Sequence, residues 1–209
     1  MTSELIDLWP TRILRTTLAG FDDNNPGLLG LVREWDKTHK NLTTDYRDNN
    51  PFEVDSAATN WLRAGVNGAV VEYLKACAIG YGVEWQIMGW ANINRHGDYH
   101  DPHNHPHSYL SGTYYVKVPN LDGPRTKGRG DQRPNRITFY DPRPSFNMQA
   151  IADDPYIEAE HTVDPVPGLL MLWPAPLIHF VHPNLSDETR VSISFNIVLK
   201  NASRYLPKQ

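Results

Sequence analysis

From residue 84 to residue 199 the chain consists of short β-type runs that Pro, Gly and Asp residues interrupt. Short runs with turn-forming residues between them are typical of antiparallel strands, because consecutive parallel strands need a long crossover connection. The pattern therefore predicts an antiparallel sandwich or barrel. The predicted strands are 84–94, 108–118, 136–140, about 157–163, 169–173, 177–181 and 190–199.

Two helices are predicted before this β region. Residues 26–39 place apolar side chains on one face, and Asn25 and Pro26 suit the cap and the first turn of that helix. Residues 56–79 repeat apolar residues at three- and four-residue spacing, which is the period of a helix with one buried face. Residues 5–14 have the pattern of an edge strand. We therefore expect a mainly β jelly roll that two N-terminal α-helices brace.

The whole chain is predicted to be a single domain, residues 1–209. Within it, residues 1–82 would form a helical support and residues 83–200 the β core. A length of 209 residues is typical of one all-β domain. Apolar residues make up 40% of the chain and charged residues 21%, which provides enough apolar material for a sizeable core.

Charge and cysteine content restrict the expected partners and compartment. The formal net charge is −4 and no basic block occurs, so no nucleic-acid partner is expected. No apolar run reaches the roughly 20 residues of a membrane span, and the N-terminus lacks the segments of a signal peptide. The single cysteine, Cys77, fits a reducing compartment. We therefore expect a cytoplasmic protein without a membrane partner, in which the two helices could form a homodimer interface.

Residues 96–107 hold five of the nine histidines, together with two aspartates, two prolines and a glycine. Gly97, Pro102 and Pro106 disfavour a helix, and the segment is too polar for a buried strand, so a turn is predicted. Imidazole is a common metal ligand, and its neutral form is well populated at neutral pH. The segment is therefore either a metal-binding turn or a solvated histidine-rich loop.

The last predicted strand alternates between apolar and polar side chains. Its apolar residues share one face, and the opposite face carries Arg190, Ser192, Ser194 and Asn196. Such a face either meets water or lines a polar cavity. In a cavity, Arg190 and Ser192 would form a clamp for a carboxylate through charge-assisted hydrogen bonds.

His179 lies in an otherwise apolar run, residues 177–181, eleven residues before Arg190. A single histidine on an apolar strand is often a core residue. The order of the motifs favours a ligand instead, because a His-x-His turn could supply two ligands and this distant strand a third. Three protein ligands on one side of a metal leave open positions, as non-haem iron(II) sites require.

Together these segments resemble the iron(II)- and 2-oxoglutarate-dependent dioxygenases. The chain looks closest to the prolyl-hydroxylase-like branch and, within it, to bacterial and phage oxygenases of unassigned substrate. The resemblance covers about residues 84–199. Its motifs are Gly97–His105, Ser111–Pro119, Val166–Pro174, Leu177–Val181 and Arg190–Asn196.

The resemblance implies a double-stranded β-helix (jelly-roll or cupin-like) core and the cofactors Fe(II) and 2-oxoglutarate. Arg190, with Ser192 beside it, would bind the distal carboxylate of 2-oxoglutarate. Tyr115, or else Tyr114, would offer a phenol to the same carboxylate. No catalytic residue beyond the metal ligands is expected.

The metal ligands that the resemblance implies are His103, His105 and His179. The family usually begins with His-x-Asp or His-x-Glu, whereas position 105 is histidine. A three-histidine site would carry one less negative charge, which should change the redox behaviour of iron.

Other ligand pairs remain open. His96 with Asp98 is a literal His-x-Asp, and His105 with His107 is a shifted His-x-His. Asp98 or Asp101 could also accept hydrogen bonds from the outer ring nitrogens of the ligands.

The implied activity is the hydroxylation of an unidentified small-molecule or peptide substrate, with release of succinate and CO2. A second reading is a cupin-like three-histidine metalloprotein that does not use 2-oxoglutarate, although Arg190-x-Ser192 argues against it. A third is a non-enzymatic jelly-roll binding module with an exposed histidine loop.

Overall fold

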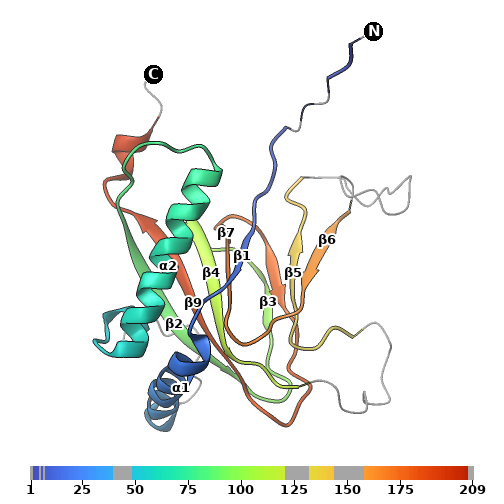
Figure 1. Ribbon diagram of the computed structural model, residues 1–209. Helices are drawn as coiled ribbons and strands as arrows, with labels where there is room; N and C mark the ends of the chain where they lie inside the picture. The colour runs from blue at the N-terminus through green and yellow to red at the C-terminus, as the bar shows by residue number, and fades with distance from the viewer. Residues whose placement is uncertain are drawn as a thin grey trace.

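The computed structural model describes residues 2–4, 6, 8–39, 49–120, 132–143 and 158–206 (Figure 1). The helices are α1 (Phe21–Thr38) and α2 (Ala57–Ala76), with 3-10 turns η1 (Pro51–Glu53) and η2 (Ala202–Tyr205). The strands are β1 (Leu14–Thr17), β2 (Trp85–Asn94), β3 (His100–His103), β4 (Leu110–Lys117), β5 (Ile137–Tyr140), β6 (Glu160–Val163), β7 (Leu169–Pro174), β8 (His179–Val181) and β9 (Arg190–Leu199).

The described strands form two antiparallel sheets that face each other as a sandwich. The larger sheet has the order β1-β7-β4-β9-β2, and the smaller sheet has the order β3-β8-β5-β6. Consecutive strands such as β7 and β8 lie in different sheets, so the chain winds back and forth between the two layers. This arrangement confirms the predicted mainly β fold, with a jelly-roll core that follows two helices.

Helices α1 and α2 cover the outer face of the larger sheet (Figure 1). Leu28 of α1, Val66 of α2 and Ile193 of β9 have no exposed surface, and all three belong to one apolar cluster between helices and sheet. Each buried side chain of this kind contributes roughly 1.5–3 kcal/mol. Because side chains alternate along a strand, the same strands direct their other residues into the sandwich.

Gly112 of β4 allows the Phe195 ring to approach the backbone of the larger sheet closely. A Cβ atom at position 112 would lie 2.4 Å from the Phe195 ring and 2.6 Å from the Met171 carbonyl oxygen. Neither contact is compatible with van der Waals radii, so the packing between sheet and helices requires glycine at this position.

The N-terminal strand lies later in the chain than predicted. Strand β1 begins at Leu14, pairs with β7 from Leu14↔Leu172 to Thr17↔Leu169, and forms an edge of the larger sheet. The described residues of the range 5–14 before Leu14 are not in a strand. Pro10 lacks the N–H group that a ladder needs, which explains why pairing starts only after it.

Helix α1 begins at Phe21 instead of residue 26, so Pro26 lies inside it. Asn25 is not a cap. Its Nδ2 donates to the Val116 carbonyl oxygen (3.0 Å), and its Oδ1 accepts from the Tyr114 hydroxyl (2.5 Å). These tertiary contacts with β4 outweigh the capping preference of asparagine. The earlier start of the helix is favoured by the acidic residues in its first turn, which interact well with the positive end of the helix dipole.

A capping box formed by Ser56 and Thr59 stabilises the N-terminus of helix α2. Ser56 Oγ accepts from the Thr59 backbone N–H (3.2 Å), and Thr59 Oγ1 accepts from the Ser56 backbone N–H (3.1 Å). The helix ends at Ala76, three residues before the predicted end at residue 79.

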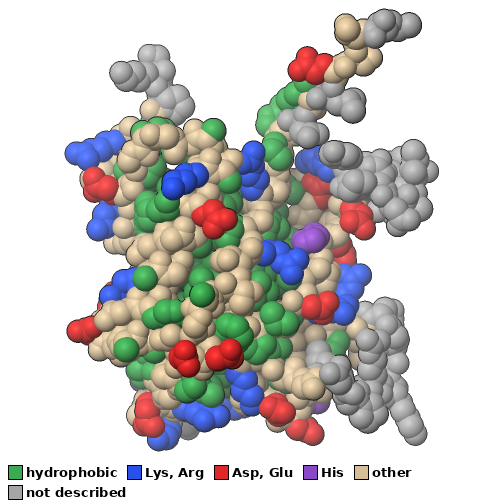
Figure 2. Space-filling view, viewed as in Figure 1, with side chains coloured by type: hydrophobic (Ala, Val, Ile, Leu, Met, Phe, Trp, Pro, Cys, Tyr) green, Lys and Arg blue, Asp and Glu red, His purple; other side chains and the backbone are tan. Residues whose placement is uncertain are grey.

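Neither described helix has the length and hydropathy to cross a membrane. On the face shown in Figure 2, basic and acidic side chains are interspersed.

Candidate functional site

Residues 96–107 contain a short strand where only a turn was predicted. Strand β3 pairs with β8, with His100 opposite Val181 and His103 opposite His179. The prediction of a turn failed because an edge strand needs partners on one side only, so it tolerates polar side chains and Pro102. The pairing places the His103 and His179 rings 4.3 Å apart between centroids.

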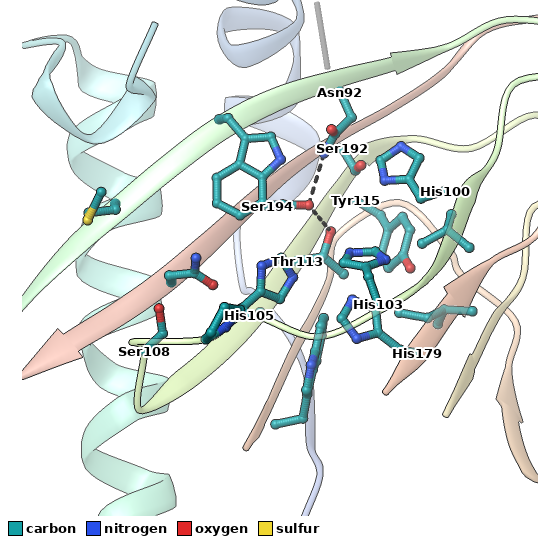
Figure 3. A pocket seen from close by; sticks show the side chains of 18 of the residues that line it. Asn92, His100, His103, His105, Ser108, Thr113, Tyr115, His179, Ser192 and Ser194 are labelled. Carbon is teal, nitrogen blue, oxygen red and sulfur yellow. Dashed lines mark hydrogen bonds between the residues drawn. The ribbon is translucent and has the colours of Figure 1, made fainter. Parts of the chain in front are cut away.

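His105 completes a group of three histidines (Figure 3). It follows β3, and its backbone N–H donates to the Ala175 carbonyl oxygen (3.0 Å), which fixes this segment against the β7–β8 connection. One ring nitrogen from each of His103, His105 and His179 lies within 4.8 Å of the others. His179 is only 3% exposed, and the other two are half-buried.

Backbone carbonyls orient two of these rings. His103 Nδ1 lies 2.5 Å from the Asp101 carbonyl oxygen, and His179 Nδ1 lies 3.1 Å from the Leu177 carbonyl oxygen. A carbonyl can only accept, so each Nδ1 carries the proton and each Nε2 has a free lone pair. The predicted carboxylate acceptors are wrong: Asp101 acts through its backbone, and the exposed Asp98 carboxylate accepts from the Arg95 backbone N–H (2.7 Å).

Burial keeps the imidazoles of His105 and His179 neutral at physiological pH. Desolvation, followed by the neighbouring His103, lowers the pKa of His179 to about 3. The same two causes lower the pKa of His105 to about 4. A neutral imidazole is the form that binds a metal.

The three histidines face a cavity of about 570 Å³ between the two sheets. At one end lies Arg190, which is 1% exposed. Its Nη1 donates to the Asn135 carbonyl oxygen (3.0 Å), while its Nε has no hydrogen-bond partner in the part of the chain that the structure describes. Among the described residues, no carboxylate forms an ion pair with Arg190. Burial lowers the pKa of the guanidinium, and Tyr115 and then Asp98 partly offset this effect. Within the described part of the chain, this buried cation therefore has no carboxylate in ion-pair contact.

Ser192 and Tyr115 line the same cavity as Arg190, and Figure 3 shows both of these side chains. The two residues are opposite each other in the β4–β9 ladder. Burial raises the pKa of Tyr115 to about 12, so its hydroxyl remains a donor. Tyr114 points the other way, to the helix side, where its hydroxyl bonds to Asn25 and its ring contacts Trp61.

The other candidate ligands lie apart from the three-histidine group. His96 and Asp98 are exposed in the turn before β3. His107 is exposed at the cavity rim with a φ of 68°, and it is not part of the group.

His100 also lines the cavity, although no role was predicted for it from the sequence. Its Nε2 lies 3.2 Å from Asn94 Nδ2. Burial, followed by the charge of Arg190, lowers its pKa to about 4. The histidine-rich composition pointed to residue 100, but only the β3–β8 pairing shows that it faces inward. Asn92 and Trp90 of β2 also line the cavity.

Comparison with known proteins places these residues in context. The sequence matches a family described as "Putative 2OG-Fe(II) oxygenase" over residues 88–196, which is more than half of the chain. No curated protein sequence matches the chain significantly.

Solved structures share the fold at low sequence identity. A Pseudomonas putida prolyl-4-hydroxylase is 14% identical, with a TM-score of 0.60 over 90% of this chain and 93% of that one. A Trichoplax adhaerens prolyl hydroxylase, in complex with a hypoxia inducible factor peptide fragment, is 11% identical, with a TM-score of 0.56 over 94% and 87%. HygX from Streptomyces hygroscopicus, with nickel and 2-oxoglutarate bound, is 10% identical, with a TM-score of 0.55 over 90% and 82%.

These similarities identify the sandwich as the double-stranded β-helix of 2-oxoglutarate oxygenases. The family match spans the three histidines, Arg190 and the strands that carry them. The chain belongs to the family of 2-oxoglutarate- and iron(II)-dependent oxygenases.

Proposed function

We propose that the protein is an iron(II)- and 2-oxoglutarate-dependent oxygenase that hydroxylates an organic substrate and releases succinate and CO2. One observation carries the proposal: three convergent histidines and a buried arginine, which has no ion-pair partner among the described residues, open into the same cavity. The first feature suits a divalent metal, and the second suits a carboxylate. The keto acid cosubstrate of the family combines both requirements.

The donor set fits iron(II). His103 and His179 hold their Nε2 lone pairs in place through backbone carbonyls, and His105 joins them from the following segment. Three ligands from one side leave coordination positions open toward the cavity. HygX, which shares the fold, binds nickel together with 2-oxoglutarate.

The far end of the cavity fits the distal carboxylate of 2-oxoglutarate. The Nε of Arg190 lacks a partner, and Ser192 and Tyr115 add hydroxyl donors around the same space. A carboxylate would supply the missing counter-charge and accept these hydrogen bonds. Since the pKa of Tyr115 is raised, its proton would stay on the phenol and orient the bound acid.

When bound, Fe(II) with 2-oxoglutarate and O2 supplies the oxidising chemistry that inserts oxygen into a C–H bond. The chain contributes the rest. The three histidines would fix the position of the metal, and Arg190 would fix the direction of the cosubstrate. The apolar lining residues Ile137, Trp173 and Val181 would limit the access of water to the cavity.

The histidine at position 105 leaves the protein ligands without negative charge. A neutral ligand set stabilises the higher oxidation states of iron less than a set with a carboxylate does. The same feature favours a second candidate function, a cupin-like metalloprotein that does not use 2-oxoglutarate. The unpaired Arg190 favours the oxygenase.

Turnover in vitro separates the two functions. Purified protein with Fe(II), O2 and 2-oxoglutarate should slowly form succinate even without a substrate, and both His179→Ala and Arg190→Met should abolish this activity. The matched control is His161→Ala, because His161 is exposed on β6 outside the cavity. Succinate formation that persists in the His179→Ala protein would contradict the proposal.

A further inference from the structure

The cavity lining follows strand β9 from Arg190 to Val198, and the part around Asn196 and Val198 lies several residues along the strand from Arg190. In Figure 3, Ser108 lies on one side of His105, and Tyr115 and Ser192 lie on the other. The walls beyond His105 come from strands β2 and β9, which pair in register. We call this part of the lining the outer wall. It consists of Met88, Trp90, Ser108, Asn196 and Val198.

We infer that the outer wall binds the substrate and selects an uncharged group with a flat or apolar surface and a carbonyl-type acceptor, such as a carboxamide. The inference rests on the proposed function, because that function assigns the Arg190 end to the cosubstrate. Three features of the wall carry it: a directed donor, the absence of charge, and an aromatic surface beside the histidines.

The directed donor is the side-chain amide of Asn196. Ser111 is 1% exposed, and its hydroxyl donates to Asn196 Oδ1 at 2.8 Å. A buried hydroxyl needs a hydrogen-bond acceptor, and among the described residues Asn196 Oδ1 is the acceptor for the Ser111 hydroxyl. The contact therefore fixes the amide with its oxygen toward Ser111. The two N–H groups of Asn196 Nδ2 therefore remain available to a ligand in the cavity that Asn196 lines.

Charged side chains are absent from the described outer wall. The described lining of the whole cavity includes one arginine, Arg190, at the opposite end, and no Asp, Glu or Lys. With the metal charge balanced by bound 2-oxoglutarate, an ionised group that left water for this wall would find no counter-charge among the wall's side chains, which is strongly unfavourable. A neutral acceptor avoids this penalty and still pairs with Asn196.

The aromatic surface lies next to the proposed metal centre. Trp90 is 6% exposed, and its ring centroid lies 5.7 Å from that of His105. Met88 lies opposite Asn196 in the β2–β9 ladder and extends the apolar surface outward. A flat group that packs on Trp90 while its carbonyl accepts from Asn196 would hold its C–H bonds near the histidines. The outer wall therefore sets both affinity and the position of attack.

Three compounds with one ring and different charge test the inference: benzamide, benzoate and benzylammonium. Each is titrated into protein loaded with Zn(II) and 2-oxoglutarate, which cannot turn over, and binding is followed by the NMR signals of the Asn196 side-chain amide and the Trp90 indole. Benzamide should bind at least about tenfold more tightly than either ion, because a buried unpaired charge costs well over 1.4 kcal/mol.

The isosteric variant Asn196→Asp replaces the donor with a carboxylate. It should weaken benzamide binding roughly tenfold or more, since a carboxylate cannot donate a hydrogen bond to the benzamide carbonyl oxygen. Asn60→Asp, on the exposed side of α2, is the matched control and should change nothing. Equal affinity for benzamide and benzoate, or equal benzamide affinity in wild type and Asn196→Asp, would overturn the inference.

The design separates this inference from the proposed function. 2-Oxoglutarate is titrated before the ring compounds, and its failure to bind would count against the oxygenase alone. The effect of Asn196→Asp on benzamide affinity is then measured with Zn(II) only, and this effect decides the inference, because without the cosubstrate benzoate would also be attracted to Zn(II) and Arg190.

Discussion

Replacing Arg190 with methionine tests the cosubstrate end of the cavity. The guanidinium is 1% exposed, and within the described ranges its Nε has no hydrogen-bond partner and no carboxylate forms an ion pair with it. A bound carboxylate would therefore be its main counter-charge. Truncating one partner of a buried, hydrogen-bonded charge pair costs about 2–5 kcal/mol. With about 3 kcal/mol, the dissociation constant of 2-oxoglutarate should rise roughly 150-fold.

The same substitution should act differently on the ligand-free protein. Methionine fills much of the arginine volume without burying a charge, so the free energy of unfolding without ligand should stay equal or increase. The stabilisation that 2-oxoglutarate gives the wild-type protein should disappear. This opposite effect on stability and affinity distinguishes a binding arginine from a structural one.

Calorimetric titration of 2-oxoglutarate into metal-loaded protein, together with urea unfolding, measures both quantities. Arg95→Met is the control, because Arg95 is exposed and pairs with Asp36 outside the cavity. Unchanged 2-oxoglutarate affinity in Arg190→Met, with metal binding intact, would refute the reasoning about this strand.

Three further predictions concern the histidines and Tyr115. Tyr115→Phe should weaken 2-oxoglutarate binding about three- to tenfold through the loss of one hydrogen bond, whereas Tyr114→Phe, on the helix side, should leave the affinity unchanged; isothermal titration compares them. His105→Asp should retain the metal and lower the iron midpoint potential, because an added negative charge stabilises the oxidised ion; electrochemistry that shows no decrease would contradict this. The free energy of unfolding of the metal-free protein should fall as the pH drops from about 7 toward 4. Burial lowers the pKa of His179 to about 3 and of His100 to about 4, so the unfolded chain takes up protons first, near pH 6.5. In urea titrations, the free energy of unfolding of His100→Gln should depend less steeply on pH than that of the wild-type protein. Equal slopes for the two proteins would count against a buried neutral His100.

The helices and most of the strands could be predicted because their signals are local. The alternation in residues 190–196 identified the polar face of β9, and the three- and four-residue period identified α2. The spacing of residues 103, 105 and 179 suggested a common site, and the structure brings these histidines together. Such patterns reflect which side of an element is buried, which sequence records directly.

The rest depended on tertiary contacts. Strand β3 was missed because its pairing with β8 compensates for a polar, proline-containing sequence. Asn25 was assigned to a cap because capping is its local preference, yet Tyr114 and Val116 of β4 bind it instead. The inward orientation of His100 likewise follows from a partner 81 residues later, Val181. No local pattern contains that information.

The most direct test of the central claim is an anaerobic titration of metal-free protein with Fe(II) and then 2-oxoglutarate, followed by visible absorption. We predict a weak charge-transfer band that appears only when both are present, and that is absent in His179→Ala. That result would show the keto acid bound to iron between the histidines and Arg190. Tight iron binding without the band would contradict the use of 2-oxoglutarate, and the absence of iron binding would contradict the metal centre itself.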